Sequence, residues 1–144
     1  MATRSRIAIE NQDGTVLSIY CHWDGYPSHH GPILLEHYTT QEKVEALIAL
    51  GSISSLAPET EIPEGVAHNF ETPADGIVVA YHRDRKEPIS IKPHGSVNDF
   101  VKSDVEEYGY IFTAAGEWLF ANGHVGAYDR EAVLLENVVV KEAE

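Results

Sequence analysis

Apolar and polar residues alternate over short runs of the chain, and this pattern predicts β-strands. Residues 6–10 and 15–20 form the first pair of runs, with Asp13-Gly14 between them. An Asp-Gly step favours a tight hairpin turn, because glycine readily adopts the positive φ that such a turn requires. Residues 110–113 and 117–121 flank a second turn, Ala114-Ala115-Gly116. The pattern therefore predicts two β-hairpins.

Three further segments have the apolar content of strands. Residues 88–93 predict a brief edge strand, and residues 132–140 predict a closing strand, although Ala-Val-Leu-Leu-Glu also suits the start of a helix. Residues 77–85 predict a longer strand. There, alternation places one set of side chains on a single face: Ile77, Val79, Tyr81, Arg83 and Arg85.

Apolar residues at helical spacing predict three helices, over residues 32–38, 41–50 and about 96–108. Thr39 and Glu42 have the spacing of a capping box at the start of the second helix, and Gly51 supplies its end. Ser96 is the expected cap of the third helix.

Together these elements predict a single α+β domain over residues 1–144. The expected architecture is a mostly antiparallel sheet of two hairpins and a central strand, with about three helices packed on one face. Residues 52–76 interrupt the pattern with several prolines and glycines, five carboxylates and no Lys or Arg. A loop of that length inside a compact domain suggests a functional lid or a mobile excursion.

Charge narrows the range of partners. The chain has 23 acidic and 10 basic residues, for a formal net charge of −13, so its surface repels nucleic acid and anionic membranes. The charge suits solubility, and it also suits binding to a basic protein. The N-terminal residues lack the apolar core of a signal peptide, no run is long enough for a membrane span, and a single cysteine fits a reducing cytoplasm.

Residues 18–27, Ser-Ile-Tyr-Cys-His-Trp-Asp-Gly-Tyr-Pro, concentrate the candidate chemistry at the end of a predicted strand. Simple packing of the aromatic rings around a turn is one interpretation. Ligand binding is another: Trp23 and Tyr26 would offer flat surfaces for a base, while His22 and Asp24 would hydrogen-bond its edge or its sugar.

A metal site is the third interpretation of this stretch, because several potential ligands occur close together: His22, Asp24, His29, His30 and His37. They lack a recognisable metal-binding spacing, so we expect no metal. Cys21 precedes His22, but strand neighbours face opposite sides, so a Cys–His nucleophile is rejected.

A second cluster is basic. Residues 81–86 contain three of the ten cations, and Arg83 and Arg85 share the predicted strand face with Tyr81. Two guanidinium groups so placed could hold a phosphate between them. An edge strand protected by charge, with Asp84 and Glu87 as partners, remains the alternative.

Other chemical signals are weak. The chain lacks a glycine-rich phosphate loop, a nucleophile elbow and a dinucleotide-binding fingerprint. The remaining histidines are isolated and are expected to lie on the surface or in loops: His68, His94 and His124. We therefore expect neither catalytic residues nor a cofactor.

The chain resembles a family of small bacteriophage and prophage proteins at residues 2–9, at Asp13-Gly14 and at residues 18–26. The resemblance does not imply a particular activity. The likeness continues through residues 31–56, 81–85 and 107–118, and is least clear in the acidic loop and the tail. His82 departs from it, because a glycine is expected at that position. The resemblance implies a phage accessory protein acting in the host bacterial cytoplasm, where such proteins often counter host defences.

The leading hypothesis is a non-enzymatic protein that sequesters a small phosphate-bearing nucleotide signal. A homo-oligomer is compatible with this role. The residues expected to bind the nucleotide are His22, Trp23, Asp24, Tyr26, Tyr81, Arg83 and Arg85, with the acidic loop closing over it. The first alternative is an acidic inhibitor of a basic host defence protein, whose binding would be salt-sensitive and independent of Trp23. The second alternative is a small metal-dependent hydrolase built on His22, Asp24 and His37.

Overall fold

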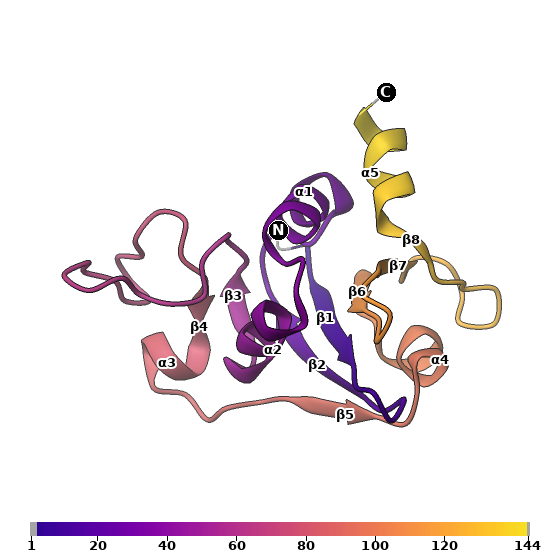
Figure 1. Cartoon of the computed structure of the whole chain (residues 1–144), viewed down its shortest axis with the longest axis horizontal. Helices are drawn as coiled ribbons and strands as arrows, with labels where there is room; N and C mark the ends of the chain where they lie inside the picture. Colours follow the sequence, from indigo (N-terminus) through magenta and orange to yellow (C-terminus); the bar gives the residue numbers. More distant parts are fainter. Residues whose placement is uncertain (1–2, 144) are drawn as a thin grey trace.

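The computed structural model describes residues 3–143, including all side chains except those of residues 103, 104 and 140–143. Within that range the chain folds around one mixed, eight-stranded sheet (Figure 1). The strands are β1 (Ser5–Glu10), β2 (Val16–Cys21), β3 (Ile53–Ser55), β4 (Val79–Ala80), β5 (Lys92–His94), β6 (Tyr108–Phe112), β7 (Trp118–Asn122) and β8 (Val133–Leu134). The helices are α1 (Pro27–His37), α2 (Gln41–Ala49), α3 (Tyr81–Arg85), α4 (Val97–Asp99) with the π-helical turn η1 (Phe100–Asp104), and α5 (Leu135–Ala143).

The strand order is β4-β3-β2-β1-β6-β7-β8, and β5 also pairs with β2. The two predicted hairpins are confirmed: β1 pairs with β2 and β6 pairs with β7, both antiparallel. However, β6 lies parallel to β1, and β3 lies parallel to β2. The expected mostly antiparallel sheet is therefore wrong, because helical crossovers return the chain beside strands laid down much earlier.

The expectation that the helices pack on one face is also wrong. Ile7 and Ile9 of β1 face a core formed with α1, α2 and α5, whereas Ala8 faces a second, smaller core with Phe100 and Val101. Successive residues of a strand point to opposite faces. The sheet is therefore covered on one side by α1, α2 and α5 and on the other by α4 and η1.

Several predicted elements have different boundaries. Helix α1 starts at Pro27, not near Pro32, and the α2 cap is Thr40, whose hydroxyl accepts from the N–H of Lys43, rather than Thr39. Gly51 ends α2 with φ +75°, as expected. The predicted helix over 96–108 stops by Asp104, where Val105 adopts an extended conformation, and residues 105–107 lead into β6 at Tyr108.

Two predicted strands are largely helical. Residues 132–140 form a two-residue strand, β8, and then enter α5. Residues 77–85 form β4 and then turn into α3. The Asp84 carboxylate accepts a hydrogen bond of 2.8 Å from the N–H of Ala80, the residue that precedes α3, and so stabilises the turn into the helix.

The acidic loop leaves β3 and returns at β4, projecting from one end of the sheet beside α3 (Figure 1). Its two ends are joined by the N–H of Glu59, which donates to Gly76, and the N–H of Val78, which donates to Glu59. Within residues 3–143, no helix combines the length and apolar character needed to cross a bilayer.

Candidate functional site

The loop after β2 is held firmly at its backbone. The N–H groups of His22 and Trp23 donate to the carbonyls of Ile53 and Ser54, continuing the sheet beyond Cys21. Asp24 then adopts φ 56°, in the left-handed region. The next residue, Gly25, donates to Thr3 over 2.8 Å. This loop is therefore a fixed platform for its side chains.

Three aromatic side chains of this loop are here called the aromatic edge: the half-buried His22 and the exposed Trp23 and Tyr26. The Nδ1 atom of His22 lies 2.7 Å from the Tyr20 hydroxyl, and the Trp23 ring meets the His22 ring edge-on at 4.8 Å. Trp23 and Tyr26 remain 43% and 39% exposed. Asp24 is also exposed, and it lies between them in the sequence.

The structure does not bring this edge together with the predicted basic cluster. Among residues 3–143, no hydrogen bond, ion pair or ring contact joins the aromatic edge to Arg83 or Arg85. The prediction that Arg83 and Arg85 share one strand face is wrong, because both lie on α3. Successive helical residues turn by about 100°, so two residues separated by one position point in very different directions.

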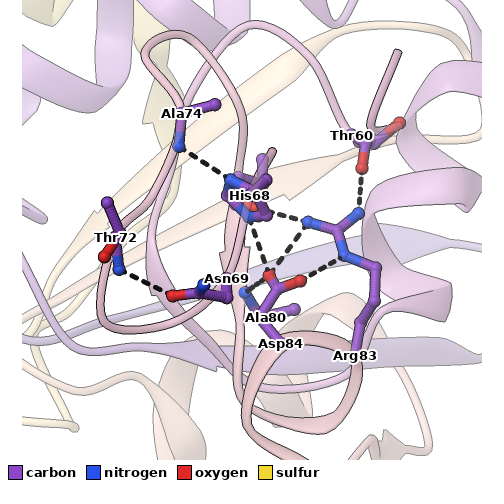
Figure 2. Close-up of polar contacts among 9 residues, drawn as sticks. Thr60, His68, Asn69, Thr72, Ala74, Ala80, Arg83 and Asp84 are labelled. Carbon is purple, nitrogen blue, oxygen red and sulfur yellow. Dashed lines mark hydrogen bonds and ion pairs between the residues drawn. The ribbon is translucent and has the colours of Figure 1, made fainter. Parts of the chain in front are cut away.

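Arg83 points inward and is fully engaged. Its guanidinium donates to both carboxylate oxygens of Asp84, at 2.9 and 3.0 Å, to the carbonyl of Val78 at 2.6 Å and to the carbonyl of Thr60 (Figure 2). These bonds use the planar fork of the group to tie α3 to the loop. Arg83 is therefore a structural residue, whereas the sequence placed it in a phosphate site.

Asp84 is the centre of this cluster. Its side chain is 1% exposed and accepts hydrogen bonds from Arg83, from the Ala80 N–H and from Nε2 of His68 at 3.1 Å (Figure 2). Burial alone would raise the pKa of Asp84, but the hydrogen bonds from Arg83, Ala80 and His68 outweigh it and hold that pKa below its usual value. The carboxylate is thus stabilised in its ionised form.

His68 extends the cluster into the acidic loop. Its side chain is fully buried, and its Nδ1 atom accepts a 2.9 Å hydrogen bond from the N–H of Ala74 (Figure 2). Because Nδ1 accepts, Nε2 carries the proton that is donated to Asp84. His68 therefore lies in a loop, which was one of the two expected positions, but its side chain is buried and not on the surface. His94 is also buried, with Nε2 2.7 Å from the Ser18 hydroxyl.

A cavity of about 530 Å³ lies between the loop and the end of α3. Its lining residues are Asn69, Phe70, Glu71, Asp84, Arg85 and Lys86. Its volume is within the range of pockets that hold small molecules. We call this the loop cavity.

The loop cavity combines an aromatic surface with two cations. The Phe70 ring lies 5.4 Å from the Tyr81 ring, and the guanidinium of Arg85 lies 4.8 Å from the centre of Phe70. The exposed Arg85 side chain also pairs with Glu87 at 3.3 Å. Of the basic residues predicted to bind phosphate, Arg85 is therefore at the cavity and Arg83 supports its wall.

The turn that presents Lys86 is locally constrained. Lys86 has φ 61°, and its N–H donates to the carbonyl of His82 over 3.1 Å. Nδ1 of His82 lies 2.7 Å from the Glu87 carbonyl and can donate to it. His82 thus brings the start of α3 back to the residue after Lys86, a contact that glycine could not make.

The other interpretations considered for residues 18–37, a cysteine nucleophile and a metal site, receive little support from the geometry. Burial raises the pKa of the Cys21 thiol to about 12, so Cys21 is unsuited to act as a nucleophile at neutral pH. The Nδ1 atoms of His29 and His30 lie 3.1 Å apart. Within the described part of the chain, no three His, Cys, Asp or Glu side chains are grouped so that they could hold a metal ion.

Sequence reasoning missed the contribution of the acidic loop to the site. Phe70 and Asn69 line the loop cavity, but they lie in a segment without periodicity. The single available signal was composition: Phe70 is an aromatic residue within an otherwise polar stretch that follows His68. Comparisons of the chain with protein family models, with curated proteins and with solved structures find no match.

Proposed function

We propose that this protein binds, without catalysis, a small phosphate-bearing ligand with a planar ring in the loop cavity. One observation carries the proposal: two of the ten cations of a chain with net charge −13 line a cavity of ligand size beside an aromatic ring. Those cations are Arg85 and Lys86, and the ring is Phe70.

Charge favours this location for an anion. Asp84 also lines the cavity, but its carboxylate is almost completely buried and is already neutralised by Arg83. Arg85 can present a guanidinium fork and Lys86 a compact ammonium group to a phosphate. Glu71 is the remaining lining carboxylate, and it can accept from hydroxyl or N–H groups of a sugar or base.

The ring contacts favour a planar ligand. Phe70 lines the cavity and packs against Tyr81 behind it, and Asn69, whose Oδ1 accepts from the Thr72 N–H, also lines the cavity and can donate from its amide nitrogen. Stacking of a base on such a ring contributes about 1–3 kcal/mol. Nucleotides combine a ring with a phosphate and so fit both features.

Calorimetric titration of the full chain with ADP tests the proposal. We expect wild-type binding to weaken about tenfold or more in Arg85→Ala and in Lys86→Ala, because each removes a charge-assisted contact. Phe70→Leu should also weaken binding, whereas Arg4→Ala, a matched loss of one exposed cation, should not. If phosphate-bearing nucleotides fail to bind wild type, or bind Arg85→Ala equally well, the site is wrongly assigned.

Recovery of the ligand distinguishes binding from catalysis. After incubation with excess protein, ADP released by denaturation should have unchanged mass. A new product formed in proportion to time would contradict the non-catalytic role. Native mass spectrometry of protein from phage-infected cells would then identify a resident ligand directly.

A second candidate function is binding of a basic protein through the aromatic edge. Trp23 and Tyr26 are exposed on a backbone that is already fixed, and such preorganised aromatics are frequent anchors in interfaces. The net charge of −13 complements a basic partner. This mode differs from the charge-based inhibition expected from the sequence, which was independent of Trp23. Here Trp23→Ala should abolish complex formation while leaving ADP binding intact, and complex formation should weaken as salt rises.

The biological setting rests on the sequence resemblance. In a phage accessory protein acting in the bacterial cytoplasm, binding in the loop cavity would remove a nucleotide signal from a host defence system. Binding at the aromatic edge would instead block a host defence protein. A defence assay with Arg85→Ala and Trp23→Ala separates the two roles.

A further inference from the structure

The two walls of the loop cavity come from different segments. Asn69, Phe70 and Glu71 belong to the acidic loop, whereas Asp84, Arg85 and Lys86 belong to α3 and the residue that follows it. The cavity therefore exists only while the loop lies against α3.

The contacts that hold the loop in place converge on two residues of α3. Asp84 accepts from Nε2 of His68, and its backbone carbonyl accepts from the N–H of Phe70 at 3.3 Å. Arg83 donates to the carbonyl of Thr60, near the start of the loop, and to that of Val78, just after it. One buried polar cluster thus fixes the loop near both ends and at its middle (Figure 2).

Apolar packing contributes little to holding the middle of this loop. Residues 61–67 are all exposed, including Ile62 and Val66. Segments with few buried apolar contacts open at a small free-energy cost unless polar contacts hold them. The polar cluster is therefore, with the contacts of the Phe70 ring to Tyr81 and Arg85, the main restraint on the loop between Thr60 and Ala74.

We infer that His68 and Asp84 form a latch that holds the acidic loop closed, so that ligand occupancy of the loop cavity and closure of the latch are coupled. The coupling rests on the function proposed above, whereas the latch itself is a property of the ligand-free protein. His68 is a positioning residue: it does not line the cavity, but it holds Asp84, which does. By linkage, a ligand that contacts both walls stabilises the closed latch, and loss of the latch weakens ligand binding to the extent that it lowers the fraction of molecules whose loop is closed.

Amide hydrogen exchange in the ligand-free protein tests the latch. The reporters are the N–H of Phe70, bonded to Asp84, and the N–H of Ala74, bonded to His68. In His68→Ala we expect both to exchange at least about tenfold faster, with the amides of β1 and β6 unchanged. His68→Gln keeps one donor and one acceptor and should restore part of the protection. His124→Ala, which removes an exposed histidine, should leave both amides as in wild type.

Different experimental results would contradict the latch and the proposed function. Unchanged protection of Phe70 and Ala74 in His68→Ala would overturn the latch, whatever the ligand results show. Global unfolding of both His68→Ala and His68→Gln would overturn it too, since His68 would then support the whole fold. If wild type fails to bind ADP while the exchange results are as expected, the latch stands and the proposed function fails.

Coupling is tested by titrating ADP into His68→Ala. Affinity should fall in proportion to the fraction of variant molecules whose loop is closed, and saturating ADP should slow exchange of both reporter amides in wild type and in the variant. Exchange of the Phe70 and Ala74 amides that saturating ADP leaves unchanged would show that the loop does not serve the cavity and would overturn the coupling.

Discussion

The Tyr110 hydroxyl donates a 2.6 Å hydrogen bond to the backbone carbonyl of Gly25, which joins the buried middle of β6 to the loop that carries the aromatic edge. Tyr110 is completely buried and its ring packs against His30 and Phe120. This contact spans 85 positions in the sequence. It shows that the position of the loop is set by the core of the sheet rather than by the loop residues alone.

Tyr110→Phe should therefore loosen the loop after β2 while keeping the ring in the core. We expect the free energy of unfolding to fall by about 1–2 kcal/mol, because the buried Gly25 carbonyl loses its donor. Urea denaturation measures this loss. Tyr128→Phe is the control, since Tyr128 is 95% exposed and its substitution should change nothing measurable.

Substitution of Arg83 should mainly lower stability, whereas substitution of Arg85 should mainly weaken ligand binding. Arg83→Ala leaves the buried Asp84 charge without its main partner, so we expect a loss of about 3 kcal/mol or more in the free energy of unfolding. Arg85→Ala breaks one exposed ion pair and should cost less than about 1 kcal/mol, while weakening ADP binding. Denaturation and titration of both variants check this, and equal stability losses would contradict the structural role of Arg83.

Stability should fall on mild acidification because of His30. This side chain is completely buried, and burial, followed by the adjacent His29, lowers the pKa of His30 to about 3. The unfolded chain takes up a proton near the ordinary histidine pKa and the folded chain does not, so the contribution of His30 is full above that pKa. Below about pH 6 it should be lost at about 1.4 kcal/mol per pH unit.

Urea denaturation between pH 7 and 5 measures this slope. His30→Gln cannot take up the proton, so its unfolding free energy should depend less on pH over this range. A slope as steep in His30→Gln as in wild type would assign the acid sensitivity to other groups.

Asp84 should make the free energy of unfolding depend on pH in a more acidic range than His30 does. Its pKa is lowered in the folded state, so its contribution to stability is present above the unfolded pKa and is lost as pH falls through the lower, folded value. Asp84→Asn should therefore be clearly less stable than wild type at pH 7. The difference should shrink below about pH 4, where Asp84 of the unfolded wild-type chain takes up a proton while the folded carboxylate stays ionised until the pH falls through its lower pKa. A difference that stays constant down to pH 2 would argue against an ionised Asp84.

Gly25 should not tolerate a side chain. A Cβ atom there would lie 2.7 Å from Cβ of Ser5 and 2.9 Å from the carbonyl oxygen of Thr3. Gly25→Ala should therefore displace the start of β1 or the loop, with a loss of about 1–3 kcal/mol. Gly126→Ala, where a Cβ would meet nothing within 4 Å, is the control.

Local signals were sufficient for part of the fold. Asp13-Gly14 identified the first hairpin, Ala114-Ala115-Gly116 identified the second, and the apolar spacing before Gly51 identified α2. Each depends on the conformational preferences of neighbouring residues, which act over a few positions. Of the candidate site, Tyr81 and Arg85 were identified by composition, because they lie in the densest group of cations in an acidic chain.

Tertiary structure decided the rest, because the deciding contacts join distant segments. The alternation over residues 77–85 predicts a strand, but Arg83 and Asp84 bond to Thr60, Val78, Ala80 and His68, and these contacts favour the helix α3. The parallel pairing of β1 with β6 likewise joins residues about a hundred positions apart. Residue patterns alone were enough to predict the two hairpins and the second helix, and composition alone gave the uneven charge. Only the folded chain decided which arginine is buried and which lines the cavity, since that depends on where the acidic loop finds its hydrogen-bond partners.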